Sequence, residues 1–183
     1  MPVYISFSAA VNQNSTEQLL GFLAAQVNAQ IDEVHLALST PGGSVMNGLN
    51  AYNVMRAMPF RLITYNVGSV NSIGNVLFLA GEERYACAIS SFMFHGVGFD
   101  APAGVRFEEK ILRERLDSIL NDQQRIGDVI RGRTNINAKE VKRLFLQAAT
   151  KDADYALEKG IIHAVREFQV PPGAQLFQLV FQG

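Results

Sequence analysis

Hydrophobic and polar positions alternate along the chain with two different periods, and segments of the two kinds follow each other. Every second residue is apolar in some segments, for example at Val3, Ile5 and Phe7, which is typical of β-strands. In other segments the apolar residues recur every three or four positions, as in helices that bury one face. The first pattern predicts strands at about residues 3–7, 34–38, 61–67, 84–94 and 161–165, and the second predicts helices at about 15–27, 45–58, 72–80, 138–148 and 153–159. Strands that alternate with helices predict an α/β fold with right-handed crossovers.

One helical pattern is longer than the others and follows a Gly- and Pro-rich loop at residues 96–104. Its apolar positions run from Leu112 to Ile130 and predict a helix of about 22 residues at roughly 108–131. At 1.5 Å per residue this helix is about 33 Å long, which is long for a small domain. It is either a long helix of the core or an arm that packs on another subunit.

Length and composition indicate one folded domain over residues 1–183, with the last fifteen or so residues as a candidate tail. Of the 183 residues, 48% are hydrophobic and 18% are charged, which is ordinary for a globular protein. Sixteen basic residues nearly balance 17 acidic ones, for a net charge of −1, and no basic patch stands out. Nucleic acid is therefore not an expected partner.

Cellular location and cofactors follow from what the chain lacks. The N-terminus has no basic start before an apolar stretch, and no run of about 18 apolar residues occurs, so neither a secretory signal nor a membrane span is expected. The single cysteine, Cys87, cannot form an internal disulfide, and no cluster of Cys and His has zinc spacing. We therefore expect a cytoplasmic protein without a metal, an organic cofactor or a membrane partner.

Two glycine-containing turns, at residues 39–44 and 68–74, each lie between a predicted strand and a predicted helix. In α/β folds such turns bring backbone N–H groups to a ligand. Ser72 is expected at a helix N-terminus, where the N–H of Ile73 can stabilise the oxyanion that forms when a serine attacks a carbonyl. Gly43, without a Cβ, can bring a second N–H close. The alternative is that Ser72 only caps the helix, as serine often does.

A serine nucleophile needs a base, and the chain has three histidines. His35 alternates with apolar residues on a predicted strand and is expected to face solvent or a polar neighbour, while His163 is expected at the surface. His95 ends an apolar run where a strand gives way to the Gly-rich loop, and catalytic residues gather at such places. His95 is therefore the candidate base, and a purely structural histidine is the alternative.

Taken together, five segments resemble the proteolytic subunit of Clp protease. They are residues 39–45 (STPGGSV), 71–74 (NSIG), 92–95 (FMFH), the long helix at about 108–131 and residues 156–162 (ALEKGII). The likeness covers about residues 30–165, and the order and spacing of the segments make the set specific. It implies a spiral of ββα units with a protruding handle helix. It also implies a homo-oligomer, because the family stacks rings into a chamber whose handle helices interlock.

The resemblance also implies the roles of individual residues in a serine endopeptidase that acts on peptides or unfolded proteins. Ser72 would be the nucleophile and His95 the general base, with the oxyanion held by the N–H groups of Gly43 and Ile73. A strand beside the site would bind an extended substrate through main-chain hydrogen bonds. The residues of that strand would be Ser44, Val45 and Met46.

The chain departs from the family pattern at three places. The family has an aspartate shortly before the final helix and strand, where the register places Ala148; loss of this carboxylate can cost on the order of 10⁴ in rate. Asp152 is the candidate replacement, although it also resembles the N-cap of the next helix. The chain begins almost directly at its first strand, without the segment that helps dock an ATPase unfoldase, so dependence on such a partner is not expected. Gly96 and Val97 follow His95 in place of the usual Gln and Pro.

Three other functions remain open at this point. A crotonase-like acyl-CoA enzyme would share the fold and the oxyanion hole, but it would need acidic residues in place of Ser72 and His95. A catalytically weak or inactive ring subunit is favoured by Ala148. A Ser–Lys pair, as in the related signal-peptide peptidases, would have to use Lys110, and the presence of His95 argues against it.

Overall fold

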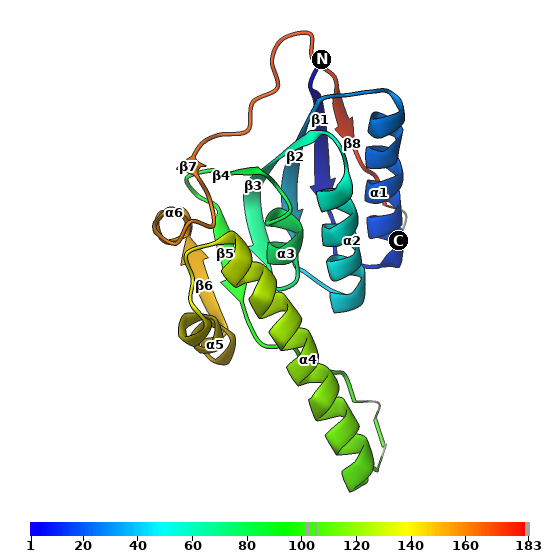
Figure 1. Cartoon of the computed structure of the whole chain (residues 1–183), viewed down its shortest axis with the longest axis vertical. Helices are drawn as coiled ribbons and strands as arrows, with labels where there is room; N and C mark the ends of the chain where they lie inside the picture. The colour runs from blue at the N-terminus through cyan, green and yellow to red at the C-terminus, as the bar shows by residue number, and fades with distance from the viewer. Residues whose placement is uncertain (102, 105, 182–183) are drawn as a thin grey trace.

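A computed structural model describes residues 1–101, 103–104 and 106–181, and it shows helices packed around one central sheet (Figure 1). The strands are β1 (Val3–Ser8), β2 (Glu33–Thr40), β3 (Arg61–Asn71), β4 (Glu83–Ala86), β5 (Ser91–Phe94), β6 (Ala149–Asp152), β7 (Ala164–Val165) and β8 (Leu176–Gln178). The helices are α1 (Gln13–Asn28), α2 (Val45–Ala57), α3 (Gly74–Phe78), α4 (Glu109–Arg133), α5 (Ala138–Gln147) and α6 (Ala153–Glu158). Strands and helices alternate through most of the chain, so the predicted α/β class is confirmed.

The sheet is parallel except at one edge. Its strands run in the order β6-β5-β3-β2-β1-β8, and β4 pairs with β3 and β7. In the described part of the chain only the pairing of β5 with β6 is antiparallel. Strand β3 is long enough to pair with β4 through residues 63–66 and with β5 through residues 69–71. The end of β3 and the strand β5 therefore lie side by side.

Several elements differ from the prediction, and the strand predicted at residues 84–94 is in fact two strands, β4 and β5. Helix α3 begins at Gly74, later than the predicted start near residue 72, because Ser72 has a left-handed backbone with a φ of 56°. Strand β6 was not predicted, since its residues show no apolar alternation and find their strand partner only in β5. Strand β8 falls within the candidate tail and pairs in parallel with β1.

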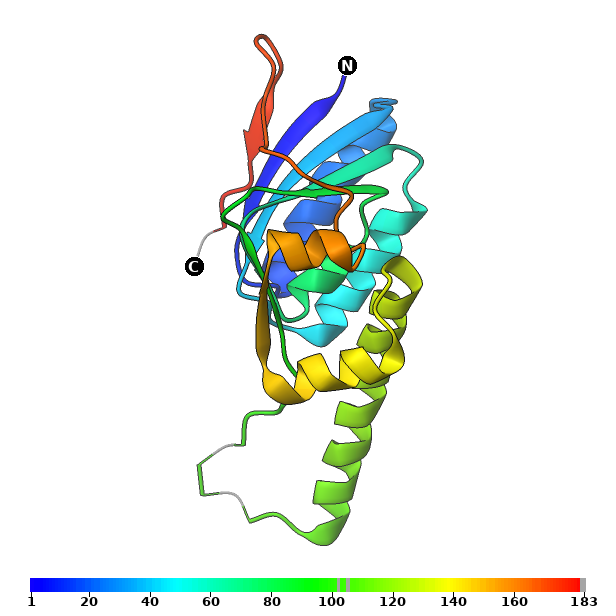
Figure 2. The ribbon, with the colours of Figure 1, turned by 90° about the vertical axis from the view of Figure 1, so that its left-hand side faces the viewer.

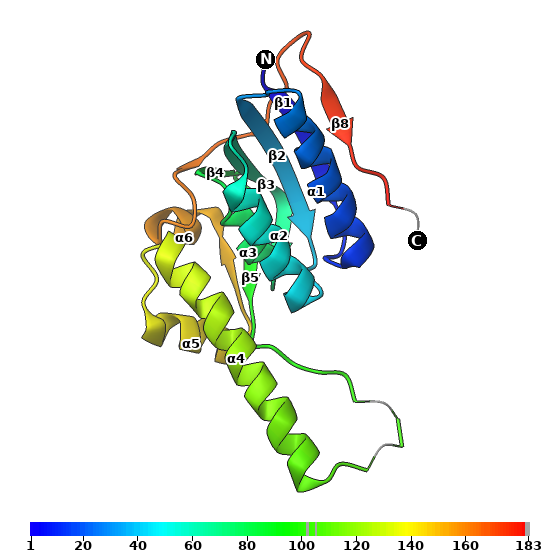
Figure 3. The same ribbon diagram turned by 45° about the vertical axis from the view of Figure 1, so that its right-hand side comes forward.

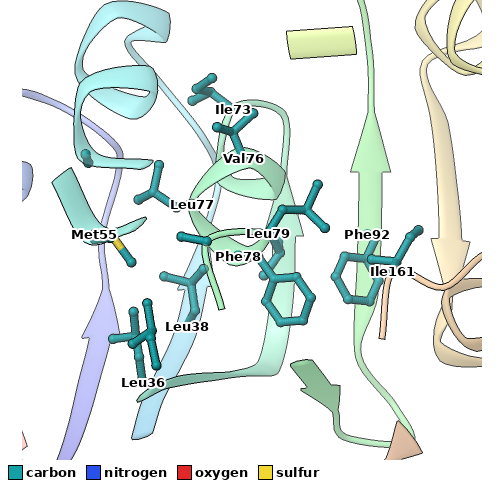
Figure 4. Packing of buried hydrophobic residues seen from close by; sticks show 14 of the residues in the cluster. Leu36, Leu38, Met55, Ile73, Val76, Leu77, Phe78, Leu79, Phe92 and Ile161 are labelled. Carbon is teal, nitrogen blue, oxygen red and sulfur yellow. The ribbon is translucent and has the colours of Figure 1, made fainter. Parts of the chain in front are cut away.

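The hydrophobic core lies between the sheet and the helices α1, α2 and α3, which cover the same face of the sheet (Figure 3). The alternating apolar residues of β2, Leu36 and Leu38, are fully buried there. Ile73, Leu77 and Phe78 come from the turn and helix that follow Ser72 and belong to the same cluster (Figure 4). The segment after Ser72 is therefore anchored in the core.

Helix α4 is the long helix predicted from the apolar stripe, and it projects from the body of the molecule (Figure 1). In its C-terminal half, Ile126 and Ile130 are buried. In its N-terminal half, Leu112, Leu116 and Leu120 are 49%, 53% and 54% exposed. The first sequence alternative, a core helix, thus describes only the second half of α4, and the first half presents an exposed apolar strip.

The C-terminal end of α4 is tied to the sheet by Arg84 of β4. Its buried guanidinium donates at 2.7–3.1 Å to four carbonyl oxygens, those of Ile161, Gly81, Arg133 and Gly160. Burial lowers the pKa of Arg84 to about 10, so the group is still charged at neutral pH. The anchor fixes the part of α4 that packs against the body.

The remaining helices flank the antiparallel edge of the sheet. Helices α5 and α6 lie at the two ends of β6 (Figure 2), close to the ranges predicted from the sequence. Within the described residues, none of the helices combines the length and the apolar character needed to cross a membrane.

Candidate functional site

The turn between β3 and α3 presents Ser72. Its left-handed conformation, with a φ of 56°, costs a non-glycine residue on the order of 1–3 kcal/mol. The N–H of Ser72 donates to the carbonyl oxygen of Met93 in β5 at 2.8 Å, which holds the turn in place. Ile73, rather than Ser72, is the N-cap residue of α3, and no side chain among the described residues caps this helix. The alternative that Ser72 serves as a helix cap is therefore wrong.

The glycine turn at residues 39–44 packs directly against the turn that carries Ser72. A Cβ on Gly42 would lie 2.7 Å from the Cβ of Ser72, so no larger residue fits beside the serine without a shift. A Cβ on Gly43 would lie 2.2 Å from the carbonyl oxygen of Val11. Two backbone hydrogen bonds of Val11 hold this turn in place. Its N–H donates to the carbonyl oxygen of Gly42 at 2.8 Å, and its carbonyl oxygen accepts the N–H of Ser44 at 2.7 Å. Both glycines are thus required by close backbone approach.

Two backbone N–H groups near Ser72 are not engaged. Among the turn and loop bonds between described residues, neither the N–H of Gly43 nor that of Ile73 is a donor. Both residues line the same cavity as Ser72. Free backbone N–H groups at such a place can stabilise negative charge that develops on a substrate oxygen.

His95 directly follows β5 and lines the same cavity. Because β5 pairs with the last residues of β3, with Asn71 opposite Met93, the chain at His95 runs close to the turn at Ser72. The next residue, Gly96, donates its N–H to the carbonyl oxygen of Phe145 in α5 at 3.1 Å. The imidazole is exposed and makes no hydrogen bond to another described residue. The backbone around His95 is held, whereas no described side chain orients its ring.

A cavity of about 130 Å³ brings these residues together. Five of the residues predicted for the site line it, namely Ser72, His95, Gly43, Ile73 and Val45. The rest of its wall is formed by Phe94, Gly96, Val97, Gly98, Ile126, Ile130 and Phe145. No residue of this wall, within the described chain, is acidic, and most of it is apolar. A hydroxyl, an imidazole and two free N–H groups on an apolar wall are a set suited to acyl transfer.

A likeness to known proteins extends over most of the chain, well beyond the site. The model of the Clp protease family matches residues 3–169. The chain belongs to the Clp protease family. Membership in this family indicates peptidase chemistry, so the crotonase-like alternative is left without support. The matched range includes both glycine turns, His95 and the whole of α4.

The strand expected at Ser44, Val45 and Met46 for substrate binding is not present, because these residues begin a helix. Ser44 is the N-cap of α2 and accepts the N–H of Asn47 at 3.4 Å, and Val45 and Met46 form the first turn of that helix. The predicted strand at these positions was therefore wrong, because the serine that follows the glycines starts a helix. Val45 still lines the cavity, whereas Ser44 and Met46 do not belong to its wall.

Asp152, the candidate third member of the triad, does not lie beside His95. It pairs with Ser91 at the opposite end of β5, which is roughly 13 Å away along the strand at 3.3 Å per residue. Its carboxylate accepts the N–H of Tyr155 at 2.9 Å and caps α6. The sequence reading of Asp152 as a helix cap thus agrees with its observed contact.

Ala148 lies where an orienting carboxylate would be useful. The antiparallel pairing of β5 with β6 ends at Phe94 and Ala149, so His95 and Ala148 are each the next residue beyond this last pair. Ala148 is the exposed cap residue of α5, and its φ of 47° is left-handed. The position that the family resemblance assigns to an aspartate therefore directly precedes the partner of Phe94, and in this chain it carries a methyl group.

Several residues at the site were not found from the sequence. Ile126 and Ile130 were predicted only as part of a helical stripe, and Phe145 not at all, because α5 is brought to the cavity by the bond from Gly96. Gly42 could have been found, since glycine pairs in tight turns indicate close backbone approach. Asn75, whose Nδ2 donates to the carbonyl oxygen of Ser72 at 3.0 Å, carried no signal, because one polar residue in a short apolar segment has no recognisable spacing.

Proposed function

We propose that this member of the Clp protease family is a serine endopeptidase with Ser72 as nucleophile and His95 as general base. The observation that supports the proposal is the shared cavity, which both side chains line together with the free N–H groups of Gly43 and Ile73. A serine hydroxyl needs a neighbouring base to become a nucleophile, and His95 is the histidine of this wall.

The proposed reaction has two halves that use the same two side chains. In the first, Oγ of Ser72 attacks the peptide carbonyl carbon while His95 takes the hydroxyl proton, and the carbonyl oxygen becomes an oxyanion bound by Gly43 and Ile73. The C–N bond then breaks as the imidazolium gives its proton to the leaving amine, which leaves an ester on Ser72. In the second half, His95 deprotonates a water molecule that attacks this ester and releases the acid.

The cavity wall indicates which substrate side chain fits. Val97, Ile126, Ile130 and Phe145 surround the space next to Ser72 and offer no charged partner. We therefore propose that an apolar substrate side chain occupies the cavity, because burial there gains hydrophobic free energy without desolvating a charge. Cys87 is a free, buried thiol, which fits a protein that works in a reducing compartment such as the cytoplasm.

A fluorophosphonate probe tests the nucleophile directly. The folded chain is expected to be modified at Ser72, located by mass spectrometry of the peptide that contains it. The Ser72→Ala variant is expected to show no modification. Ser69→Ala is the matched control and should react like the unaltered chain, because the Ser69 hydroxyl is bound to that of Ser91 at 3.1 Å. Modification that persists in Ser72→Ala would overturn the assignment.

A catalytically inactive ring subunit is the second candidate function. Two observations favour it: no described residue of the cavity wall is acidic, and Ala148, which directly precedes the partner of Phe94, carries no carboxylate to orient the ring of His95. An unaltered chain that is folded but never reacts with the probe would support this candidate over the peptidase.

We also propose that copies of the chain assemble into rings that enclose the cavity, as the family generally does. The exposed strip of Leu112, Leu116 and Leu120 on α4 is an apolar surface that assembly would bury. Light scattering at micromolar concentration is expected to give a mass several times 20.1 kDa. Leu116→Glu should lower that mass, whereas Leu146→Glu, on an exposed position of α5, should not. A monomeric unaltered chain would contradict the proposal.

A further inference from the structure

Asn75 is a buried polar residue next to Ser72 that the proposed reaction does not use. It lies in the short helix α3, three residues after Ser72, and only 2% of its surface is exposed. Its neighbours Val76, Leu77 and Phe78 are apolar and fully buried. Burial of a primary amide in such surroundings costs free energy because its hydration is lost, and an apolar residue of similar size would not have this cost. The presence of Asn75 therefore indicates that its hydrogen bonds have a specific role.

The side chain of Asn75 joins two segments of backbone. Its Nδ2 donates to the carbonyl oxygen of Ser72 at 3.0 Å and to that of Met93 at 2.8 Å. The same oxygen of Met93 accepts the N–H of Ser72 at 2.8 Å. Met93 lies in β5, two residues before His95. One amide group therefore links the backbone of the proposed nucleophile to the strand that carries the proposed base.

The orientation of this amide is set by its two acceptors. If nitrogen and oxygen exchanged places, Oδ1 would face two carbonyl oxygens and repel both. In the observed orientation Oδ1 is buried and has no hydrogen-bond partner among the described residues. The structure thus leaves one buried acceptor unsatisfied while both donor contacts are made, which is the arrangement expected of a group retained for its donors.

The link acts at a place where small displacements matter. Ser72 has a strained left-handed backbone, and no described side chain holds the ring of His95. Proton transfer needs the two groups within hydrogen-bond reach, and a misplacement of 1 Å can cost about 100-fold in rate. We propose that Asn75 is a positioning residue of the hydrolysis described above, which sets the separation of the Ser72 turn from the strand of His95. The proposal rests on the proposed peptidase function, but the link can be measured without activity.

The test compares Asn75→Ala with Asn66→Ala. Asn66 is also a buried asparagine that ties β3 to β5, through Nδ2 to the carbonyl oxygen of Ser91 at 2.8 Å, but at the end of β5 away from His95. Asn75→Ala is expected to lower kcat and the rate of probe modification about 10- to 100-fold, with KM nearly unchanged because Asn75 does not line the cavity. Asn66→Ala should lower thermal stability comparably and leave kcat within about twofold. Equal kcat losses in the two variants would overturn a positioning role.

Hydrogen exchange provides the measurement that does not need activity. Mass spectrometry of peptides covering residues 70–78 is expected to show roughly tenfold faster exchange in Asn75→Ala than in Asn66→Ala, because the two bonds of Asn75 that join this turn to β5 are lost. Gly68, whose N–H donates to Oδ1 of Asn66 at 3.1 Å, lies outside these peptides. Unchanged exchange would overturn the link itself, whether or not the unaltered chain reacts with the probe. Should Asn75→Ala fail to fold, Asn75→Leu keeps the size, removes both donors and suits the apolar surroundings, and the same two outcomes decide.

Discussion

Replacement of Ala148 by aspartate is expected to raise kcat/KM for peptide hydrolysis by up to about 10⁴-fold. Residue 148 and His95 are each the next residue beyond the last pair of β5 and β6, Phe94 and Ala149, and no described residue of the cavity wall is acidic. A carboxylate at this position would accept one N–H of the imidazole and leave the other nitrogen free to take the proton of Ser72. It would also stabilise the imidazolium that forms during the reaction.

The backbone at position 148 suits the substitution. Ala148 has a φ of 47° and a ψ of 53°, and aspartate adopts this left-handed region more readily than alanine does. The residue is exposed, so a carboxylate there would not be buried without a partner. We therefore expect the fold and the thermal stability to change little.

The matched control for this gain of activity is Ala148→Asn. Asparagine has the same size as aspartate and also tolerates the left-handed conformation, but it carries no charge to stabilise an imidazolium. It is expected to change the rate by less than about tenfold. Initial rates on a fluorogenic peptide with an apolar residue before the cleaved bond measure both variants. A folded Ala148→Asp protein without any gain would show that residue 148 does not reach His95.

Local patterns in the sequence were sufficient for most of the fold. The period of two found β1, β2 and β3, and the period near 3.6 found α1, α2 and α4, because each of these elements buries one face against the same core. Strand β6 escaped prediction because its four residues become a strand only through pairing with β5. The strand expected at residues 44–46 came from the resemblance, whereas the local signal of Ser44 as an N-cap indicated a helix.

The candidate site was less accessible from the sequence than the fold. Ser72 and His95 could be proposed because each follows a strand at a turn or loop, and both line one cavity. Phe145 and Asn75 could not be proposed, since the first reaches the cavity from a helix about 50 residues further on, and the second depends on the bond between Asn75 and Met93. Contacts between distant segments of this kind leave no periodic signal in a single sequence.

The proposed pair of Ser72 and His95 leads to the second large effect, which depends on residue 148. In serine proteases with a complete triad, loss of the serine or the histidine lowers kcat by about 10⁶, whereas loss of the aspartate lowers it by about 10⁴. In a chain without that carboxylate, loss of the serine or the histidine can therefore lower kcat only by about a further 10². His95→Ala is expected to cost about 10² in the unaltered chain and about 10⁶ in the Ala148→Asp background.

The same reasoning predicts that the two losses do not add. Ser72→Ala, His95→Ala and the double variant should show the same residual rate, because the hydroxyl and the imidazole accomplish one proton transfer together. His163→Ala is the histidine control; its ring accepts the backbone N–H of Arg84 at 3.0 Å, outside the cavity wall, so hydrolysis should be unaffected. Kinetics of the three variants on one peptide are the measurement. Losses that multiply in the double variant would mean that Ser72 and His95 act independently, which the proposed mechanism does not allow.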